Sequence, residues 1–348
     1  MSQRRRPGPT ARAATAVAVL ATALAACSGS DGAATSEGGG KAAAGVISLA
    51  DARAVLRNYV KVNNAANATR DAEKTATIES GAMLAQSQAG FRQYPAWSEK
   101  EQEQSKTPFS YPVGSARFYI PRKGSADFFM VNTAITGEGI AKDRRRLIVF
   151  KSVVDEKAKG GKGWRAVTVG EVTGKPPAVD VDGDGFATPL AATGRVGSLP
   201  LGDLVSLSQD FYVTGGTKAA ASFADTTAVK DWKKAYADRA PAADKCVDGE
   251  YAAGSGGGDT AYGMKTEDGG ALVLYDFGVQ YKNWGKADCG GGDLKLKNLP
   301  VISDIYLDGR TSVTILTRTE SLMALAVVPP SGKKVQVTGY QERLTSAQ

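Results

Sequence analysis

The chain contains no histidine among its 348 residues. Histidine is the commonest general base near neutral pH, the usual zinc ligand and the standard activator of serine and cysteine nucleophiles. Its absence excludes hydrolases that use a Ser-His-Asp triad and metalloenzymes whose sites depend on histidine. Chemistry based on carboxylate, lysine or tyrosine side chains stays open, and the sequence assigns no catalytic residue.

Long apolar runs are also missing, because a helix that crosses a bilayer needs about 20 apolar residues. The Ala/Val/Leu segment that begins at Ala13 is too short, and the stretch from Leu322 to Val328 has the length of a buried strand. The first segment follows four arginines and no acidic residue, which predicts a signal peptide over residues 1–26. Three of these arginines are consecutive, as in twin-arginine signals, but Pro7 and Gly8 follow them, which favours general secretion.

The signal segment ends in Leu24-Ala25-Ala26-Cys27. A cysteine directly after small residues can form a diacylglyceryl thioether before the peptidase cuts in front of it, and this run resembles the bacterial lipobox. Acyl chains such as palmitate bury in a bilayer with about 0.8 kcal/mol per CH2 group. We therefore predict that Cys27 is lipidated and anchors the protein in the lipid bilayer of the cell membrane, on the extracytoplasmic face. The alternative is an ordinary Ala-x-Ala cleavage site followed by a cysteine without a role.

Residues 27–45 comprise this cysteine and a segment rich in serine, glycine and alanine. Such a composition cannot bury enough apolar surface to offset the entropy that ordering would cost. We therefore expect a flexible tether between the membrane and the folded part of the chain.

Charges are nearly balanced once the signal peptide is removed. The full chain has 43 basic and 36 acidic residues, but four of the arginines lie in residues 1–26, which leaves 39 basic residues. The basic run from Lys142 to Arg146 is typical of a solvated hairpin end before a strand. We therefore expect no nucleic-acid partner, because nucleic-acid binding needs clustered basic patches.

Cysteine is scarce, with three residues in the chain, so that Cys246 and Cys289 remain as a pair once Cys27 is lipidated. An exported protein meets an oxidising compartment, where such a pair forms a disulfide. Closing this loop would contribute about 4 kcal/mol in the chain-entropy model, and reduction should loosen the C-terminal half. Two buried or reactive thiols are the alternative.

Helical patterns precede strand patterns in the first half of the folded part. Ser48 and Asp51 predict a helix start, and apolar residues then recur at helical spacing as far as Val60. A second helical stretch follows Thr69 and stops at Pro95. Four antiparallel strands are predicted next, separated by turn residues, at 114–120, 127–135, 145–154 and 164–172.

The second half repeats this order of elements. After a region rich in proline, glycine and aspartate, helices are predicted over 201–213 and 226–240. Strands are then predicted near residues 246–252, 260–265, 271–284, 312–328 and 334–344.

Helices followed by an antiparallel sheet indicate an α+β fold. About 300 folded residues are more than one core usually serves, so the repeated order predicts two similar domains. Their expected bounds are 46–173 and 200–348, with an interdomain linker over 174–199.

Four stretches carry a family resemblance: Tyr59-Val60-Lys61-Val62-Asn63-Asn64, Arg70-Asp71, Ile78-Glu79-Ser80-Gly81-Ala82, and Asp180 to Pro189. Together with the lipobox, they resemble cell-surface lipoproteins of actinobacteria, the high-GC Gram-positive bacteria, whose domain has no known function. An N-terminal helical hairpin packed on a curved antiparallel sheet also resembles the NTF2-like and cystatin-like superfolds. These resemblances imply a location and a fold, and none of the motifs is a catalytic signature.

The stretch from Asp180 to Gly185 has carboxylates at alternating positions and glycine at the sixth, which matches the start of an EF-hand calcium loop. Ala191 stands at the twelfth position, where a bidentate glutamate is expected, and no helix ends just before this stretch. We predict an acidic turn in the interdomain connection. The alternative is a structural calcium ion held by Asp180, Asp182 and Asp184, and no other cofactor is expected.

Cone-shaped domains of this kind would have a pocket between the first helix and the concave face of the sheet. Tyr59, Asn63, Glu79 and Asp127 are the polar residues that could point into it. The resemblance to steroid-isomerase-like members of the superfold implies that a buried carboxylate there could act as a general base with a raised pKa. Nothing in the spacing requires this, since such residues more often cap helices or face solvent.

The sequence therefore favours a membrane-anchored, non-catalytic binding or accessory module at the cell surface. Such a module would meet a ligand, a cell-wall component or a partner protein through the concave face of a sheet or through the interdomain groove. The alternative is a histidine-independent enzyme that uses a pocket carboxylate.

Overall fold

The computed structural model describes residues 44–156, 161–239, 245–296, 299, 301–330 and 333–348. These residues belong to one compact unit, Ala43–Gln348. The predicted signal peptide, Cys27 and the tether as far as residue 43 lie outside the described residues. Among the described helices, none combines the length and the apolar character that a membrane crossing requires.

The end of the predicted tether is part of the folded unit. The Lys123 amide donates a hydrogen bond to the Ala44 carbonyl at 2.8 Å, and the Val46 amide donates to the Pro121 carbonyl at 2.9 Å. Residues 44 and 45 therefore belong to the fold rather than to the tether.

Helix α1 (Leu49–Thr69) begins where the sequence predicts it. The Ser48 hydroxyl accepts a hydrogen bond from the Asp51 amide at 3.1 Å, which satisfies one of the free N–H groups of the first turn. The helix ends at Arg70, whose φ of 56° lies in the left-handed region. One face of the helix is buried and consists of Ala52, Leu56, Tyr59, Asn63 and Ala66. The helical period thus carries two polar side chains into the interior.

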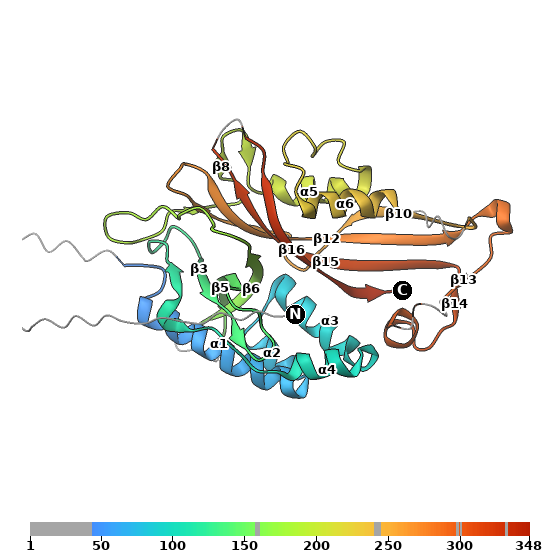
Figure 1. The fold of residues 1–348 in the computed structure, drawn as a ribbon, viewed down its shortest axis with the longest axis horizontal. Coiled ribbons are helices and arrows are strands. Elements are labelled where there is room, and N and C mark those ends of the chain that lie inside the picture. The colour runs from blue at the N-terminus through green and yellow to red at the C-terminus, as the bar shows by residue number, and fades with distance from the viewer. Residues whose placement is uncertain (1–43, 157–160, 240–244, 297–298, 300, 331–332) are drawn as a thin grey trace, which may run out of the picture. The chain divides into compact units, whose positions relative to one another are not determined.

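Three shorter helices follow: α2 (Ala72–Ala76), α3 (Gly81–Gln93) and α4 (Glu99–Lys106) (Figure 1). Pro95 lies in the 3-10 turn η1 (Tyr94–Ala96) directly after α3, in agreement with the predicted stop. The sequence pattern does not predict α4, because this helix contains no apolar residue. A capping box formed by Ser98 and Glu101 defines its start instead.

The first sheet is the predicted antiparallel meander, in the order β2–β3–β5–β6. Its strands are β2 (Arg117–Tyr119), β3 (Phe128–Ala134), β5 (Arg145–Val154) and β6 (Lys162–Val172). Alternate residues of β3 and β5 enter two different cores. Phe129 and Phe150 pack with Leu56 of α1, whereas Met130 and Val149 face the opposite side.

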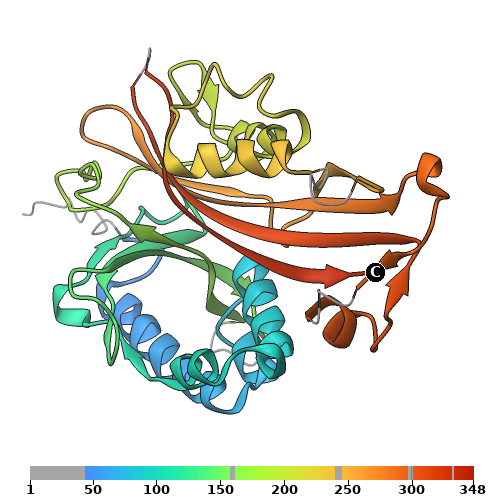
Figure 2. The same cartoon turned by 45° about the vertical axis from the view of Figure 1, so that its right-hand side comes forward.

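The second sheet has the order β16–β15–β12–β11–β7, and β10 pairs with the remaining length of the β12 edge that β11 leaves free. Its strands are β7 (Pro189–Leu190), β10 (Val247–Gly254), β11 (Ala261–Lys265), β12 (Ala271–Gly285), β15 (Ile315–Val328) and β16 (Gln336–Ala347). Helices α5 (Asp203–Thr214) and α6 (Thr227–Ala237) cover one face of this sheet (Figure 2).

Short elements complete the described chain. They are β1 (Phe109–Ser110), β4 (Thr136–Gly137), β8 (Arg195–Val196), β9 (Leu199–Pro200), β13 (Leu294–Lys295), β14 (Ser312–Val313), the 3-10 turns η2 (Val113–Ser115) and η3 (Ala287–Cys289), and the π-helical turn η4 (Val301–Tyr306).

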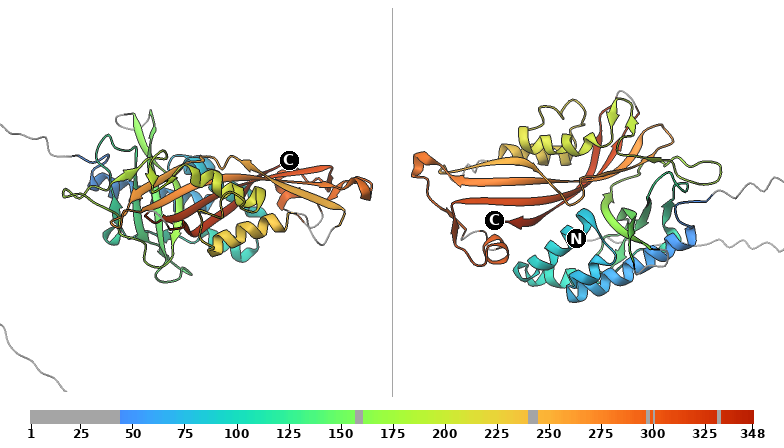
Figure 3. Two further views of the ribbon diagram at one scale, coloured as in Figure 1. Left: turned by 90° about the horizontal axis from the view of Figure 1, so that it is seen from above. Right: turned by 180° about the vertical axis from the view of Figure 1, so that it is seen from behind.

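The two sheets pack face to face. Leu272 and Leu274 of β12 and Leu325 of β15 share a core with Met130 and Val149 of the first sheet. The intervening residues of β12, such as Val273 and Phe277, face α5 and α6. The layers therefore follow one another as helices, sheet, sheet, helices, an order that is also visible from behind (Figure 3).

The structure confirms the α+β class and the antiparallel sheets, but it does not confirm two NTF2-like domains. The two halves share one core between the sheets. The predicted linker also joins the second sheet, because β7 pairs with β11 and Val179 forms a bridge with Thr266. The bounds of two domains with a linker over 174–199 stay a prediction.

Cys246 and Cys289 form the predicted disulfide, with their Cα atoms 5.5 Å apart. The bond lies at the end of the β10–β12 ladder, where the Lys286 amide donates a hydrogen bond to the Cys246 carbonyl at 2.8 Å. It therefore ties the loop that follows β12 to the start of β10.

The double variant Cys246→Ser/Cys289→Ser should be less stable than the parent protein. The disulfide spans a sequence separation of 43 residues. Removing the covalent link that closes a loop of this size should lower the free energy of unfolding by about 4 kcal/mol in the chain-entropy model. Urea unfolding measures this change, and dithiothreitol should lower the stability of the parent but not of the variant. Equal stability of parent and variant under oxidising conditions would contradict the expectation.

Candidate ligand pocket and its buried carboxylate

Three of the four predicted pocket residues meet in the interior of the N-terminal half. The Tyr59 hydroxyl donates a hydrogen bond to Glu79 Oε1 at 2.9 Å, and Asn63 Nδ2 donates to the same oxygen at 3.0 Å. Tyr59 and Asn63 lie one turn apart on α1, whereas Glu79 lies just before α3. Asn67, one turn further along α1, donates to Asn63 Oδ1 at 2.8 Å. The sequence therefore identified a polar cluster, and its members form a buried hydrogen-bond network.

Glu79 is the least accessible member of this cluster, with 0% of its surface exposed. Burial raises the pKa of its carboxyl from 4.5 to about 7, while hydrogen bonding to Ser87, Tyr59 and Asn63 opposes this shift. The second oxygen, Oε2, is buried and has no partner of ordinary hydrogen-bond geometry among the described residues.

Asp127 is not part of this cluster. It lies just before β3, its side chain is exposed, and its carboxylate is 3.6 Å from Lys151 Nζ. Because β3 begins at the next residue, Asp127 is at the rim of the sheet, where its charge can be solvated.

A second buried carboxylate, Asp276 on β12, has no counterpart in the sequence prediction. It is 1% exposed, and burial raises the pKa of its carboxyl to about 7. Its Oδ1 atom has no hydrogen-bond partner among the described residues. The alternation of β12 places Asp276 on the same face as Leu272 and Leu274, toward the first sheet.

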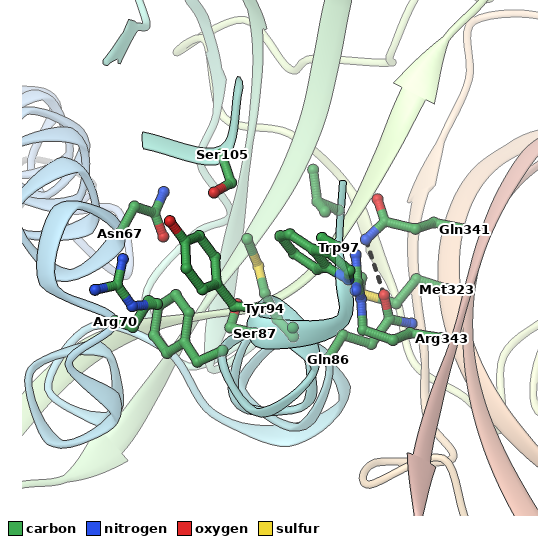
Figure 4. Close-up of a pocket in the computed structure, with 14 residues that line it drawn as sticks. Asn67, Arg70, Gln86, Ser87, Tyr94, Trp97, Ser105, Met323, Gln341 and Arg343 are labelled. Carbon is green, nitrogen blue, oxygen red and sulfur yellow. Dashed lines mark hydrogen bonds between the residues drawn. The ribbon is translucent and has the colours of Figure 1, made fainter. Parts of the chain in front are cut away.

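A pocket opens beside the Glu79 cluster, around α3, and is lined from the end of α1 and α4 on one side and from β15 and β16 on the other (Figure 4). It encloses about 170 Å³, which is small compared with the roughly 300–1,000 Å³ of sites for drug-sized ligands. Ser87 and Asn67 line this pocket and also interact with the Glu79 cluster, so the two features share a wall. The other lining residues are Arg70, Met83, Gln86, Gly90, Phe91, Tyr94, Trp97, Ser105, Val169, Met323, Gln341 and Arg343.

Two arginines and two aromatic rings dominate the chemistry of the pocket. The Arg70 guanidinium carbon lies 4.2 Å from the centroid of the Tyr94 ring, and that of Arg343 lies 5.6 Å from the Trp97 ring. In Figure 4, Arg70 and Tyr94 lie at one side of the pocket, and Trp97 and Arg343 at the other. Burial lowers the pKa of Arg343, because a guanidinium charge inside the protein is poorly solvated.

Side-chain amides connect the wall of the pocket to both halves of the chain. Gln341 Nε2 donates to Gln86 Oε1 at 2.8 Å, and Gln86 Nε2 donates to the Ser321 carbonyl at the same distance. Gln93, seven residues after Gln86 on α3, accepts a hydrogen bond from Arg343 Nη1 at 3.3 Å. These bonds fix α3 against β15 and β16, so the pocket depends on the packing of the two halves.

The sequence prediction missed the residues that give this pocket its charge. Arg70 stands in one of the stretches that carry the family resemblance, which was a usable signal. Arg343 and Gln341 lie on the last strand, far along the chain, and nothing in their local sequence marks them.

The acidic stretch Asp180 to Asp184 carries ion pairs with basic side chains. Arg122 Nε is 2.7 Å from Asp182 Oδ2 and Arg122 Nη2 is 2.6 Å from Asp184 Oδ2. Lys265 Nζ is 3.2 Å from Asp180 Oδ2. In the part of the chain that the structure describes, no group of three or more acidic, cysteine or histidine side chains is arranged to hold a metal ion. A calcium ion bound by Asp180, Asp182 and Asp184 would therefore have to replace these ion pairs.

The model of a protein family described as a domain of unknown function, DUF8094, matches residues 43–348. The chain belongs to the DUF8094 family. The matched range contains the pocket, the Glu79 cluster and the disulfide, so all three are features of the DUF8094 domain of this chain. An uncharacterized lipoprotein of Streptomyces coelicolor is 31% identical over 264 residues, which cover 74% of this chain and 72% of that protein. No solved structure matches the chain.

The variant Glu79→Gln should remove part of the pH dependence of stability of the DUF8094 domain. Because the folded-state pKa is raised from 4.5 to about 7, the stabilising protonated form is present at low pH and is lost as the pH rises through 7. The free energy of unfolding of the parent should therefore fall by about 3 kcal/mol from this group between pH 4 and 8.

Urea unfolding at pH 4 and pH 8 measures this difference, which should be smaller in Glu79→Gln. Asp276→Asn is a second test, because burial also raises the pKa of this carboxyl to about 7, so this variant should lose a separate part of the pH dependence. A Glu79→Gln variant that keeps the full pH dependence of the parent would contradict the assignment.

Millimolar calcium should leave the melting temperature of the parent protein unchanged, because Arg122 and Lys265 already neutralise the carboxylates that would bind the ion. The control is Asp182→Asn/Asp184→Asn, which removes two of the proposed ligands. A calcium-dependent rise of the melting temperature in the parent that this variant lacks would establish the ion site instead.

Proposed function

We propose that this chain is a lipid-anchored protein of the extracytoplasmic membrane face, where its DUF8094 domain acts as a non-catalytic binding or accessory module. Three observations support the anchor: the run Leu24-Ala25-Ala26-Cys27, the lipoprotein name of the Streptomyces relative, and the Cys246–Cys289 disulfide, which suits an oxidising compartment. The partner implied by the anchor is the lipid bilayer.

The observation that carries the binding role is the pocket beside α3. It combines charged, amide and aromatic side chains in a concave site, which is the usual makeup of a site that orients a ligand. Its wall is built from both halves of the chain through the Gln86 and Gln93 contacts. A small ligand, or one terminal group of a cell-wall component or protein partner, fits its volume.

A histidine-independent enzyme is the second candidate, favoured by the Glu79 carboxyl with its pKa of about 7. The geometry supports this candidate less well than the binding module. Oε1 of Glu79 already accepts two hydrogen bonds, and the carboxyl has no exposed surface. A general base must reach the proton of a substrate, whereas Glu79 lies behind the wall of the pocket.

The variant Cys27→Ser tests the anchor. Without the thiol no thioether can form, so the mature protein should move from the membrane fraction to the soluble fraction, and acyl labelling with a palmitate analogue should disappear. Cell fractionation with immunoblotting measures the first effect and detection of the incorporated label measures the second, and Ser28→Ala, one residue away, should behave as the parent in both. A Cys27→Ser protein that stays in the membrane fraction and is fully processed would overturn the proposal.

A further inference from the structure

No ion pair among the described residues neutralises the two arginines of the pocket. Within the described residues, Arg122 and Arg144 pair with carboxylates, whereas Arg70 and Arg343 form no ion pair. Their neighbours are aromatic rings and amides. The two guanidinium groups therefore bring positive charge to one small cavity whose lining contains no acidic side chain.

Each of these guanidinium groups also has a hydrogen-bond donor without a partner among the described residues. Arg70 Nη1 and Arg343 Nε are buried and have no hydrogen-bond partner among the described residues. Arg343 donates a hydrogen bond from Nη1 to Gln93. The other N–H groups of its planar, fork-shaped guanidinium are available as donors to a ligand. A buried donor without a partner is unfavourable, and an oxyanion is the group that best satisfies such a fork.

The dimensions and the remaining walls restrict what could bind there. A cavity of about 170 Å³ holds a group comparable in size to a single small ring. Trp97 and Tyr94 offer flat surfaces, and Met83 and Met323 offer apolar ones. The site thus suits a compact group with one acidic end and one flat or apolar side.

We infer that this pocket binds the oxyanionic group, carboxylate or phosphate, of a small ligand by hydrogen bonds from the Arg343 guanidinium, with the flat part of the ligand against Trp97 and Tyr94. The positive charge of Arg70 at the other side of the pocket adds to the attraction for the anion. This inference rests on the binding role proposed above and specifies the chemistry of the ligand. The amides of Gln341 and Asn67 provide further polar groups at the wall.

Isothermal titration of the full chain in a neutral detergent, at low ionic strength, tests the inference with three probes: benzoate, its neutral analogue benzamide, and inorganic phosphate. At least one oxyanion should bind about tenfold or more tightly than benzamide, because a hydrogen bond to a charged group is worth at least this factor. Benzoate and phosphate distinguish a carboxylate from a phosphate ligand. Equal affinities for all three probes, or no binding by either anion, would overturn the inference.

The variants Arg343→Gln and Arg70→Gln should each weaken anion binding about tenfold or more, and Arg343→Lys should restore little, since it keeps the charge but loses the fork. The matched control Arg57→Gln removes an exposed arginine of α1 outside the pocket and should bind as the parent. If Arg343→Gln does not fold, as judged by circular dichroism, Arg70→Gln alone decides. Parent-like binding by Arg70→Gln would overturn the assignment.

The Cys27→Ser protein separates this inference from the proposed anchor. It should bind the anion with the affinity of the parent while leaving the membrane fraction. If the parent is released from the membrane by Cys27→Ser but neither protein binds the anion, the pocket chemistry alone is refuted. If both proteins bind the anion but Cys27→Ser stays in the membrane fraction, the anchor alone is refuted.

Discussion

The face-to-face packing of the two sheets is the constraint on which the rest of the domain depends. Leu272, Leu274 and Leu325 of the second sheet meet Met130 and Val149 of the first in a shared apolar core. Each sheet has a second apolar face, which a pair of helices must cover, because buried apolar area is the main stabilising contribution. The four-layer order follows from this requirement. It joins two halves, each with helices followed by strands, into one folded unit.

The pocket is a consequence of the same packing. Helix α3 lies between the first sheet and the strands β15 and β16, and its polar residues Gln86 and Gln93 meet backbone and side-chain partners on those strands. The pocket beside α3 is lined by arginine and aromatic side chains, and leucine side chains do not fill it. The site therefore requires both halves of the chain to be in place.

Glu79 illustrates how a fold can hold an ionisable group at a position that is unfavourable for its charge. Because its carboxyl is shielded from water, the neutral form is favoured and the pKa rises to about 7, although the hydrogen bonds from Tyr59 and Asn63 oppose this shift. The shared wall of Ser87 and Asn67 brings this group close to the pocket. The charge state of Glu79 therefore bears on the stability of the domain.

The sequence by itself determined the local elements and the chemistry of the individual segments. The helix from Ser48 to Val60 and the strands of both halves were predicted from patterns among neighbouring residues. The disulfide was predicted from the number of cysteines. The sequence also gathered Tyr59, Asn63 and Glu79 as one polar group. The tertiary structure decided that Asp127 lies apart, that the two sheets share one core, and that Arg70 and Arg343 line the same pocket. These facts depend on contacts between residues up to 255 positions apart, such as Gln86 and Gln341, and no local pattern records which faces of distant strands and helices will meet.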